Sequence, residues 1–276
     1  MPADMSTLYL DLLKRTLTRY DFGDLRYPVR ARNVMLDRAL RLIASCLQPL
    51  GLSLDRVRPF DPVLRDEGRG QAYDAETMVG TKRLDNLEHC VTMVIKDGIP
   101  GDLLEAGVWR GGSAIFMRAL LEALGDETRS VWAADSFQGL PRPDPSVSAD
   151  RGDKHHQNFA LAVSLDEVKS NFRKYGFLDA RVKFLEGWFS ETLPGAPIES
   201  LAVLRADGDM YASTMDILVP LYPKVSEGGF VIIDDYGAIP ACRQAVDDFR
   251  GANSITDPLI TIDWTGVYWR KRGEEQ

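Results

Sequence analysis

Four aspartates follow two separate apolar runs in the C-terminal half of the chain. Asp207 and Asp209 follow the first run, and the pair Asp234 and Asp235 follows the second. If both runs are strands of a parallel sheet, their carboxyl ends meet at one edge and bring these side chains together. Converging carboxylates repel one another, so they commonly share a cation, and Mg²⁺ prefers such ligands. The pattern therefore predicts a hard-metal site.

Such a site could act on a hydroxyl group. A cation lowers the pKa of an alcohol bound to it and directs the oxygen toward an electrophile, while a nearby carboxylate takes the proton. A structural interpretation competes, in which Asp209 caps the helix that follows and Asp235 lies in a turn with Gly237. It accounts for one or two of the four aspartates, but not for two strands that each end in acid.

A glycine-rich turn upstream is the second candidate for chemistry. Glu105 ends an apolar run just before Gly107, and further glycines lead to Ser113, where we expect a helix. The spacing does not match the GxGxxG of dinucleotide-binding proteins. An acid before the first glycine instead suits the ammonium of S-adenosylmethionine, and Asp135, after the next apolar run, suits ribose hydroxyls. Because Asp135 would equally suit NAD or a helix N-cap, the turn alone leaves these alternatives open.

The elements that must position these residues alternate between strands and helices. Hydrophobic periodicity predicts strands at 103–106, 130–134, 182–185, 201–206 and 230–233, separated by helices at 113–124, 165–175, 211–222 and 240–250. This alternation indicates a parallel sheet with right-handed crossovers. Further strands at 259–263 and 267–270 are joined by so short a link that they must form an antiparallel hairpin. An α/β fold with a mostly parallel, Rossmann-like sheet and an antiparallel C-terminal hairpin is typical of class I methyltransferases.

The N-terminal part of the chain is predicted to be largely helical. Helices are expected at 6–20, 34–48 and 76–96, with an irregular surface segment or lid at 51–73. We expect two domains, an N-terminal helical or lid extension at 1–75 and a methyltransferase domain at 76–276. The N-terminal helices suggest either a mobile lid or a contact between copies of the chain, in a homodimer or higher homo-oligomer.

Composition narrows the possible partners. The chain has 276 residues, a net charge of −8 and a pI near 5.0, which gives a nucleic-acid partner little electrostatic support. Its cysteines, Cys46, Cys90 and Cys242, are far apart, which fits a reducing compartment rather than a disulfide framework. We find no signal-peptide core and no apolar run near the ~20 residues of a membrane span. A cytoplasmic protein without membrane contact is expected.

Several motifs occur in a fixed order along the chain. They are LYLDLLKR at 8–15, ETMVGTKRLDNL at 76–87, LEAGVWRGGS at 104–113, ADSFQG at 134–139, GWF at 187–189, RADGDMY at 205–211 and IIDDY at 232–236. Together they resemble the macrocin O-methyltransferase family, which includes the mycinamicin and novobiocin sugar methyltransferases. The resemblance covers about residues 8–20 and 76–270. It implies S-adenosylmethionine- and Mg²⁺-dependent methylation of hydroxyls, commonly on deoxysugars of natural products.

The resemblance also implies roles for individual residues. It makes Asp207, Asp234 and Asp235 the metal ligands and Asp209 the general base, a role that Asp207 could share. Nine further residues would bind the cofactor. At its methionine end these would be Glu105, Gly107 and Ser113, at its ribose Asp135 and Ser136, and at its adenine Gly187 and Trp188. The last two, Thr77 and Met78, would close over it. For Trp188, core packing is the competing interpretation.

Two segments depart from the sugar-modifying members of the family. Residues 21–75 form a longer and different insert, and the segment 144–165 is shorter. Both would cover the acceptor, so the substrate is the least defined part of the interpretation. Five side chains near these segments or the acidic motifs are either acceptor contacts or ordinary surface and packing residues: Lys14, His155, His156, Tyr211 and Tyr236.

The predicted reaction is an in-line displacement in which the acceptor oxygen attacks the sulfonium methyl group. A cation that holds two neighbouring oxygens would favour vicinal diols, which include sugars and catechols. The main prediction is an O-methyltransferase acting on a hydroxyl of a sugar or glycosylated natural product. The alternatives are a catechol-type phenol as acceptor, a dinucleotide-dependent oxidoreductase, and a non-catalytic nucleotide-binding module.

Overall fold

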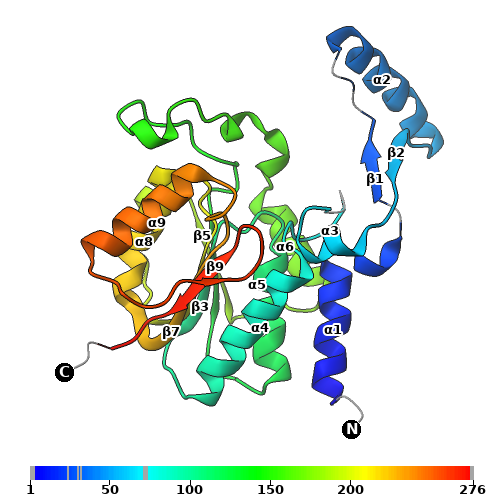
Figure 1. The fold of residues 1–276 in the computed structure, drawn as a ribbon. Helices are drawn as coiled ribbons and strands as arrows, with labels where there is room; N and C mark the ends of the chain where they lie inside the picture. The colour runs from blue at the N-terminus through cyan, green and yellow to red at the C-terminus, as the bar shows by residue number, and fades with distance from the viewer. Residues whose placement is uncertain (1–3, 24, 30, 32, 71–73, 274–276) are drawn as a thin grey trace.

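A seven-stranded sheet forms the centre of the structure, a computed structural model that describes residues 4–23, 25–29, 31, 33–70 and 74–273. The strand order is β5-β4-β3-β6-β7-β9-β8 (Figure 1). The strands are β3 (Asp102–Ala106), β4 (Val131–Asp135), β5 (Val182–Glu186), β6 (Leu201–Ala206), β7 (Val225–Ile233), β8 (Ile260–Thr261) and β9 (Val267–Arg270). β3 to β7 are parallel, whereas β9 is antiparallel to both β7 and β8. The predicted mixed sheet and C-terminal hairpin are confirmed, although β8 is shorter than expected.

Helices cover both faces of this sheet (Figure 1). One face carries α1 (Met5–Leu17), α4 (Thr81–Lys96), α5 (Gly112–Ala123) and α6 (Leu165–Lys174). The other carries α7 (Phe189–Thr192), α8 (Tyr211–Leu221) and α9 (Pro240–Ala252). Every residue of the central strand β6 is buried, because the strand is covered on both sides. This explains why its sequence is continuously apolar apart from one arginine.

The strand order reverses between β3 and β6. From β3 the chain moves outward through β4 to β5, then returns to place β6 on the other side of β3 and continues to β7. The connections therefore diverge above the carboxyl ends of β3 and β6. In open α/β sheets a crevice at such a point is where ligands bind.

The helix expected at 76–96 begins later, at Thr81. The preceding backbone makes other contacts: the amide of Glu76 donates to the carbonyl of Leu17, and the carbonyl of Glu76 accepts from Gly112 at 2.9 Å. A Cβ on Gly112 would lie 2.5 Å from that carbonyl, so only glycine permits this approach. Residues 76–79 thus lie across the start of α5 instead of forming a helical turn.

The segment before residue 76 contains more regular structure than expected. β1 (Leu25–Pro28) and β2 (Asp55–Arg58) form an antiparallel pair, and α2 (Val34–Leu47) lies between them in the sequence. Figure 1 shows this unit extending away from the sheet. The prediction of α2 was correct. The prediction of an irregular segment at 51–73 was wrong, because this segment contains β2 and α3 (Pro62–Asp66). Residues 71–73 of the segment lie outside the described part of the chain. α1 ends at Leu17, three residues before the predicted end.

The connection after β4 has little regular structure. It contains three short 3₁₀ turns, Ser148–Asp150, His155–Gln157 and Phe159–Leu161, before α6 begins. In the part of the chain that the structure describes, no helix is long and apolar enough to cross a bilayer.

Candidate functional site

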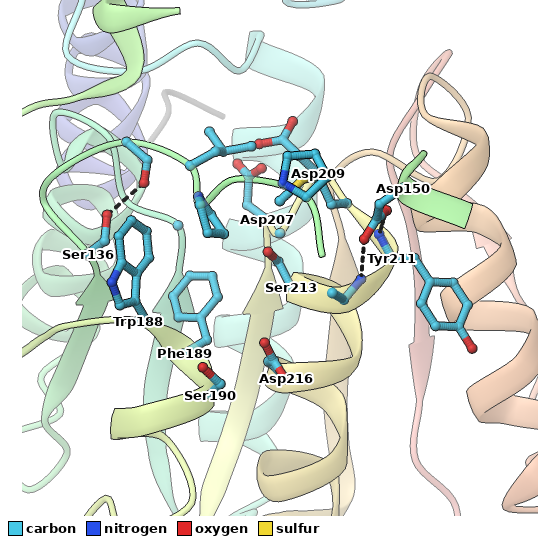
Figure 2. A pocket seen from close by; sticks show the side chains of 18 of the residues that line it. Ser136, Asp150, Trp188, Phe189, Ser190, Asp207, Asp209, Tyr211, Ser213 and Asp216 are labelled. Atoms are coloured by element: carbon cyan, nitrogen blue, oxygen red, sulfur yellow. Dashed lines mark hydrogen bonds between the residues drawn. The ribbon is translucent and has the colours of Figure 1, made fainter. Parts of the chain in front are cut away.

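A cavity of about 680 Å³ opens at the carboxyl ends of the strands (Figure 2). Its volume lies within the usual range for small-molecule sites. Seven of the predicted site residues line it: Met78, Gly107, Asp135, Ser136, Trp188, Asp207 and Asp209. The other predicted residues, Thr77, Glu105, Ser113, Gly187, Asp234 and Asp235, do not line it. They lie behind or beside its wall.

Carboxylates from two neighbouring strands meet beside this cavity. Asp207 follows β6, and Asp234 and Asp235 follow β7. One carboxylate oxygen from each of these residues lies within 4.8 Å of the others. The Oδ2 atom of Asp235 is buried and has no hydrogen-bond partner in the described structure. A buried orphan acceptor within a set of carboxylate oxygens fits a divalent cation such as Mg²⁺.

Two buried arginines, which the sequence reasoning missed, hold the carboxylates from behind. Arg83 donates from Nη1 to Oδ2 of Asp234 at 2.5 Å, and Arg205 donates from Nη2 to Oδ1 of the same aspartate. Arg205 also donates from Nη1 to Oε1 of Glu105 at 2.6 Å and to Oδ2 of Asp207 at 3.2 Å. An arginine inside an otherwise apolar strand was the one available signal, because a buried charge requires partners.

The arginines separate the acids into two electrostatic classes. Burial favours the neutral form of Asp234, but Arg205 and Arg83 outweigh it and hold the pKa of that carboxyl below its usual range. Burial and the neighbouring Asp234 raise the pKa of Asp207 to about 6 despite Arg205. Burial, followed by the charges of Asp207 and Asp209, raises the pKa of Asp235 well above its usual value. A cation would remove the repulsion that Asp207 and Asp235 experience.

Asp209 lies at the turn between β6 and α8. Its backbone has φ of 55°, in the left-handed region that a non-glycine residue rarely adopts. Burial and the charge of Asp207 raise the pKa of Asp209 to about 7. A carboxylate that faces a cavity with such a pKa can accept a proton near neutral pH.

Strained backbone recurs at this edge of the sheet. Trp109, after β3, has φ of 47°, and Phe137, after β4, has φ of 55°. With Asp209, three strands that end at the cavity are each followed by a non-glycine residue in the left-handed region. Such strain costs about 1–3 kcal/mol per residue and clusters at functional sites.

Glu105 is buried in the strand edge instead of facing the cavity. It is 2% exposed, and its Oε1 atom is paired with Arg205. Burial raises the pKa of Glu105 to about 8, although Arg205 acts in the opposite direction. The hydroxyls of Thr77 and Ser113 lie 3.4 Å apart behind the same turn. The residues predicted for the methionine end of the cofactor therefore lie around the same turn, and of these Gly107 is the one that lines the cavity.

Asp135 lies at the end of β4 and fixes the loops around it. Its Oδ2 atom accepts from the amides of Val108 at 2.8 Å and Trp109 at 3.3 Å, and its Oδ1 atom accepts from the amide of Phe137 at 2.8 Å. The hydroxyl of Ser136 donates to the carbonyl of Gly139 at 2.7 Å. Asp135 is not the helix N-cap that was the structural alternative, because the first helical element after it begins only at Ser148; it holds the loops around it and forms part of the cavity wall.

One side of the cavity is formed by residues 140–161, anchored by an aspartate that the sequence reasoning also missed. Asp150 is 2% exposed and accepts hydrogen bonds from the amides of Tyr211 at 2.7 Å and Ala212 at 2.9 Å (Figure 2). A carboxylate at the N-terminus of α8 is also favoured by the helix dipole. The indole of Trp109 adds a second anchor by donating to the carbonyl of Ala160 at 2.9 Å.

The remaining candidate residues from the sequence differ in whether they reach the cavity. Tyr211 lines the cavity, whereas Tyr236 donates its hydroxyl to Asp247 outside it. His155 is paired with Asp153 at 2.6 Å, and the charge of His155 acts to lower the pKa of Asp209. His156 does not line the cavity. Lys14 does not reach the site, because it is buried between Asp85 at 2.5 Å and Glu88 at 2.6 Å on α4.

Comparison with known proteins places this architecture among methyltransferases. The profile of the macrocin O-methyltransferase (TylF) family matches residues 6–271. The chain is 54% identical to demethyldecarbamoylnovobiocin O-methyltransferase of Streptomyces niveus, over 96% of this chain and 94% of that protein. It is 50% identical to 8-demethyl-8-(2,3-dimethoxy-alpha-L-rhamnosyl)-tetracenomycin-C 4'-O-methyltransferase of Streptomyces olivaceus, over 98% and 95%. The solved structure of the O-methyltransferase NovP superposes with a TM-score of 0.83 at 45% identity, covering 97% of this chain and 100% of NovP.

Proposed function

The chain belongs to the macrocin O-methyltransferase family and is an O-methyltransferase of the class I fold, and we propose that it uses S-adenosylmethionine and Mg²⁺ to methylate a hydroxyl of a sugar on a natural product. The observation that carries the metal is the set of oxygens from Asp207, Asp234 and Asp235 within 4.8 Å, beside a cavity of about 680 Å³. The sugar acceptor is supported by the rhamnosyl-tetracenomycin and novobiocin relatives.

In this proposal Asp207, Asp234 and Asp235 hold the cation. Both oxygens of Asp234 already accept from arginine, but each carboxylate oxygen has a second lone pair that can face a metal. When bound, Mg²⁺ would lower the pKa of the acceptor hydroxyl and S-adenosylmethionine would supply the methyl group. The carboxylates of Asp207 and Asp235 follow adjacent strands and would hold the cation from both sides, at the end of the cavity where the acceptor hydroxyl reacts.

Asp209 accepts the proton of the acceptor hydroxyl. It faces the cavity, and Figure 2 draws its carboxylate near that of Asp207. Residues 140–161 exclude water from that end of the cavity and supply its acceptor wall. The cofactor would lie along Gly107, Ser136 and Trp188, with Met78 closing over it. Glu105, Thr77 and Ser113 would support the methionine end through the turn that contains Gly107, and Asp135 and Gly187 the ribose and adenine ends.

The cellular and quaternary setting is part of the same proposal. We place the enzyme in the cytoplasm as a homodimer or higher homo-oligomer, with residues 76–276 as the methyltransferase domain and residues 1–75 as an extension. α1 of that extension packs against α5 and α4.

The experiment is a methyl-transfer assay with labelled S-adenosylmethionine, a panel of glycosylated natural products and simple catechols, with Mg²⁺ or with EDTA. Methylation of a glycoside that EDTA abolishes and Mg²⁺ restores is the expected result. Exclusive methylation of catechols would replace the acceptor class, and full activity in EDTA would refute the metal. If S-adenosylhomocysteine does not bind in isothermal titration, the cofactor assignment is wrong.

A further inference from the structure

The cavity has a polar end that the proposed mechanism does not use. Away from Asp207 and Asp209, it is lined by Phe189 and Ser190 from α7 and by Asp216 from α8. Figure 2 draws Asp216 below Phe189, with Ser190 beside it. α7 packs against α8, so these side chains come from two elements in direct contact.

Asp216 is an isolated acceptor in this region. In the described structure no hydrogen bond or ion pair involves its carboxylate, which is only partly buried and therefore open to the cavity. Burial alone raises the pKa of Asp216 from its usual value, since no cationic side chain among the described residues acts to lower it. An ionised carboxylate accepts hydrogen bonds but donates none, so its natural ligand here is a donor group.

The order of the strands indicates which part of the cofactor reaches this point. β3, β4 and β5 are consecutive in the sheet, so Gly107, Asp135 and Gly187 follow one another along its edge. A cofactor with its methionine end at Gly107 and its ribose at Asp135 extends its base toward the end of β5. There Trp188 and Phe189 offer flat apolar surface for a purine ring, and Ser190 follows directly.

We propose that Asp216 accepts a hydrogen bond from the exocyclic amine of the cofactor's adenine and thereby selects adenine over other purines, an inference that rests on the use of S-adenosylmethionine proposed above. The amine of adenine is a donor without acceptor capacity, and it matches a carboxylate. A purine with a carbonyl oxygen at the same position would set two acceptors against each other. Sites built around one hydrogen bond reject analogues that cannot make it.

The acceptor sugar is the competing occupant, and the position of Asp216 disfavours it. The hydroxyl to be methylated must lie beside Asp207 and Asp209, where residues 140–161 form the outer wall. Asp216 instead faces α7, which follows β5 on the cofactor side of the sheet. The aromatic pair next to it also suits a base better than a sugar ring with many hydroxyls.

The experiment measures binding of two ligands by isothermal titration, S-adenosylhomocysteine and S-inosylhomocysteine, in which a carbonyl replaces the amine. The original chain should bind the inosine analogue roughly 10- to 100-fold more weakly. Asp216→Asn keeps the size of the side chain and adds a donor for the carbonyl. This variant should weaken S-adenosylhomocysteine and bring the two affinities to within about threefold of each other. Glu191→Gln makes the same chemical change at an exposed position outside the cavity and should keep the original preference.

Each other outcome has a defined meaning. Equal affinities in the original chain overturn the proposal without any variant, so a misfolded Asp216→Asn cannot obscure the result. An unchanged preference in Asp216→Asn also overturns it, and a raised KM for the acceptor in that variant would assign Asp216 to the acceptor instead. Absence of S-adenosylhomocysteine binding in the original chain would refute the proposed function itself, which is a separate result.

Discussion

Arg205 and Glu105 are paired at 2.6 Å in the middle of the sheet, although 100 positions separate them in the sequence. The same guanidinium contacts Asp207 and Asp234. One side chain therefore links the acid behind the cofactor turn to two acids of the expected metal site. The two halves of the site therefore share one buried charge.

Replacing Arg205 should destabilise the protein strongly. Arg205→Met leaves the buried Glu105 without a counter-charge and Asp234 with Arg83 alone, and losing one member of a buried ion pair costs about 3–5 kcal/mol. The free energy of unfolding from urea titration tests this. Arg173→Met is the control, since Arg173 is exposed on α6 and its loss should change stability by less than about 0.5 kcal/mol. Equal effects of the two changes would contradict the structural role of Arg205.

Asp209→Asn should separate proton transfer from metal binding. The amide cannot accept the proton, so kcat should fall roughly 10²- to 10⁴-fold. Mg²⁺ binding should persist, because Asp207, Asp234 and Asp235 are intact. Asp235→Asn should give the reverse pattern, with weaker Mg²⁺ binding and activity partly recovered at high Mg²⁺. Steady-state rates over a range of Mg²⁺ concentrations distinguish the two variants. Identical Mg²⁺ dependence in both would argue against separate roles for Asp209 in proton transfer and Asp235 in metal binding.

Asp150→Asn should loosen the wall formed by residues 140–161. Asparagine keeps the size of the side chain but not the charge that accepts from the amides of Tyr211 and Ala212. A loss of about 1–2 kcal/mol in unfolding free energy is expected. KM for the acceptor should rise while the affinity for S-adenosylhomocysteine stays constant, since we propose that the cofactor binds on the other side of the cavity. Weaker cofactor binding with an unchanged acceptor KM would show that the wall serves the cofactor instead.

Gly107→Ala should be far more damaging than Gly125→Ala. Both glycines have positive φ, 90° and 71°, so both alanines suffer strain of about 1–2 kcal/mol. At Gly107 the new Cβ would also lie 2.1 Å from the carbonyl oxygen of Asp207, whereas at Gly125 nothing lies within 4 Å. Thermal melting should show the larger loss for Gly107→Ala, together with weaker Mg²⁺ binding as Asp207 is displaced. Similar melting temperatures for the two variants would refute the close approach.

Asp216 should make the stability of the ligand-free protein fall as pH rises. Burial raises its pKa in the folded state, so the folded state binds a proton more tightly than the unfolded state does. Its contribution to stability is therefore lost as pH rises from about 4 through the folded pKa. Asp216→Asn should remove this loss and stabilise the ligand-free protein at pH 7 relative to pH 4. Denaturant titrations of both proteins at several pH values provide the measurement, and a constant difference across pH would contradict it.

The sheet was predictable because its strands are buried on both faces and read as apolar runs bounded by glycine or acid. The positions of Asp207, Asp209, Asp234 and Asp235 followed from the same reasoning, since parallel strands place their ends together. The arginines behind them did not follow, because Glu105 and Asp234, which pair with Arg205 and Arg83 deep in the sheet, lie on other elements. Local sequence carries no record of such partners.

Other differences between the predicted and the observed structure also come from contacts between residues that are distant in sequence. Residues 76–79 directly precede the periodic apolar residues of α4, but the backbone of Glu76 is held by Leu17 and Gly112, which are distant in sequence. Asp150 is one of many polar residues in an irregular segment, and its function as an N-terminal cap for α8 exists only in the folded chain. β1 and β2 pair across the intervening α2, so neither strand is bounded by a hairpin turn that the sequence could indicate.

The position of β6 between β3 and β7 determines when the sheet can be completed during synthesis at the ribosome. β3, β4 and β5 emerge first, and β3 then presents an unpaired edge until residues 201–206 follow. An exposed edge of this kind invites pairing with other nascent chains. Asp234 arrives later still, after β7, so the set of acids around Arg205 is complete only when that residue has left the exit tunnel. Chains released before that point should be insoluble and inactive, and translation pausing in this interval should favour aggregation over folding.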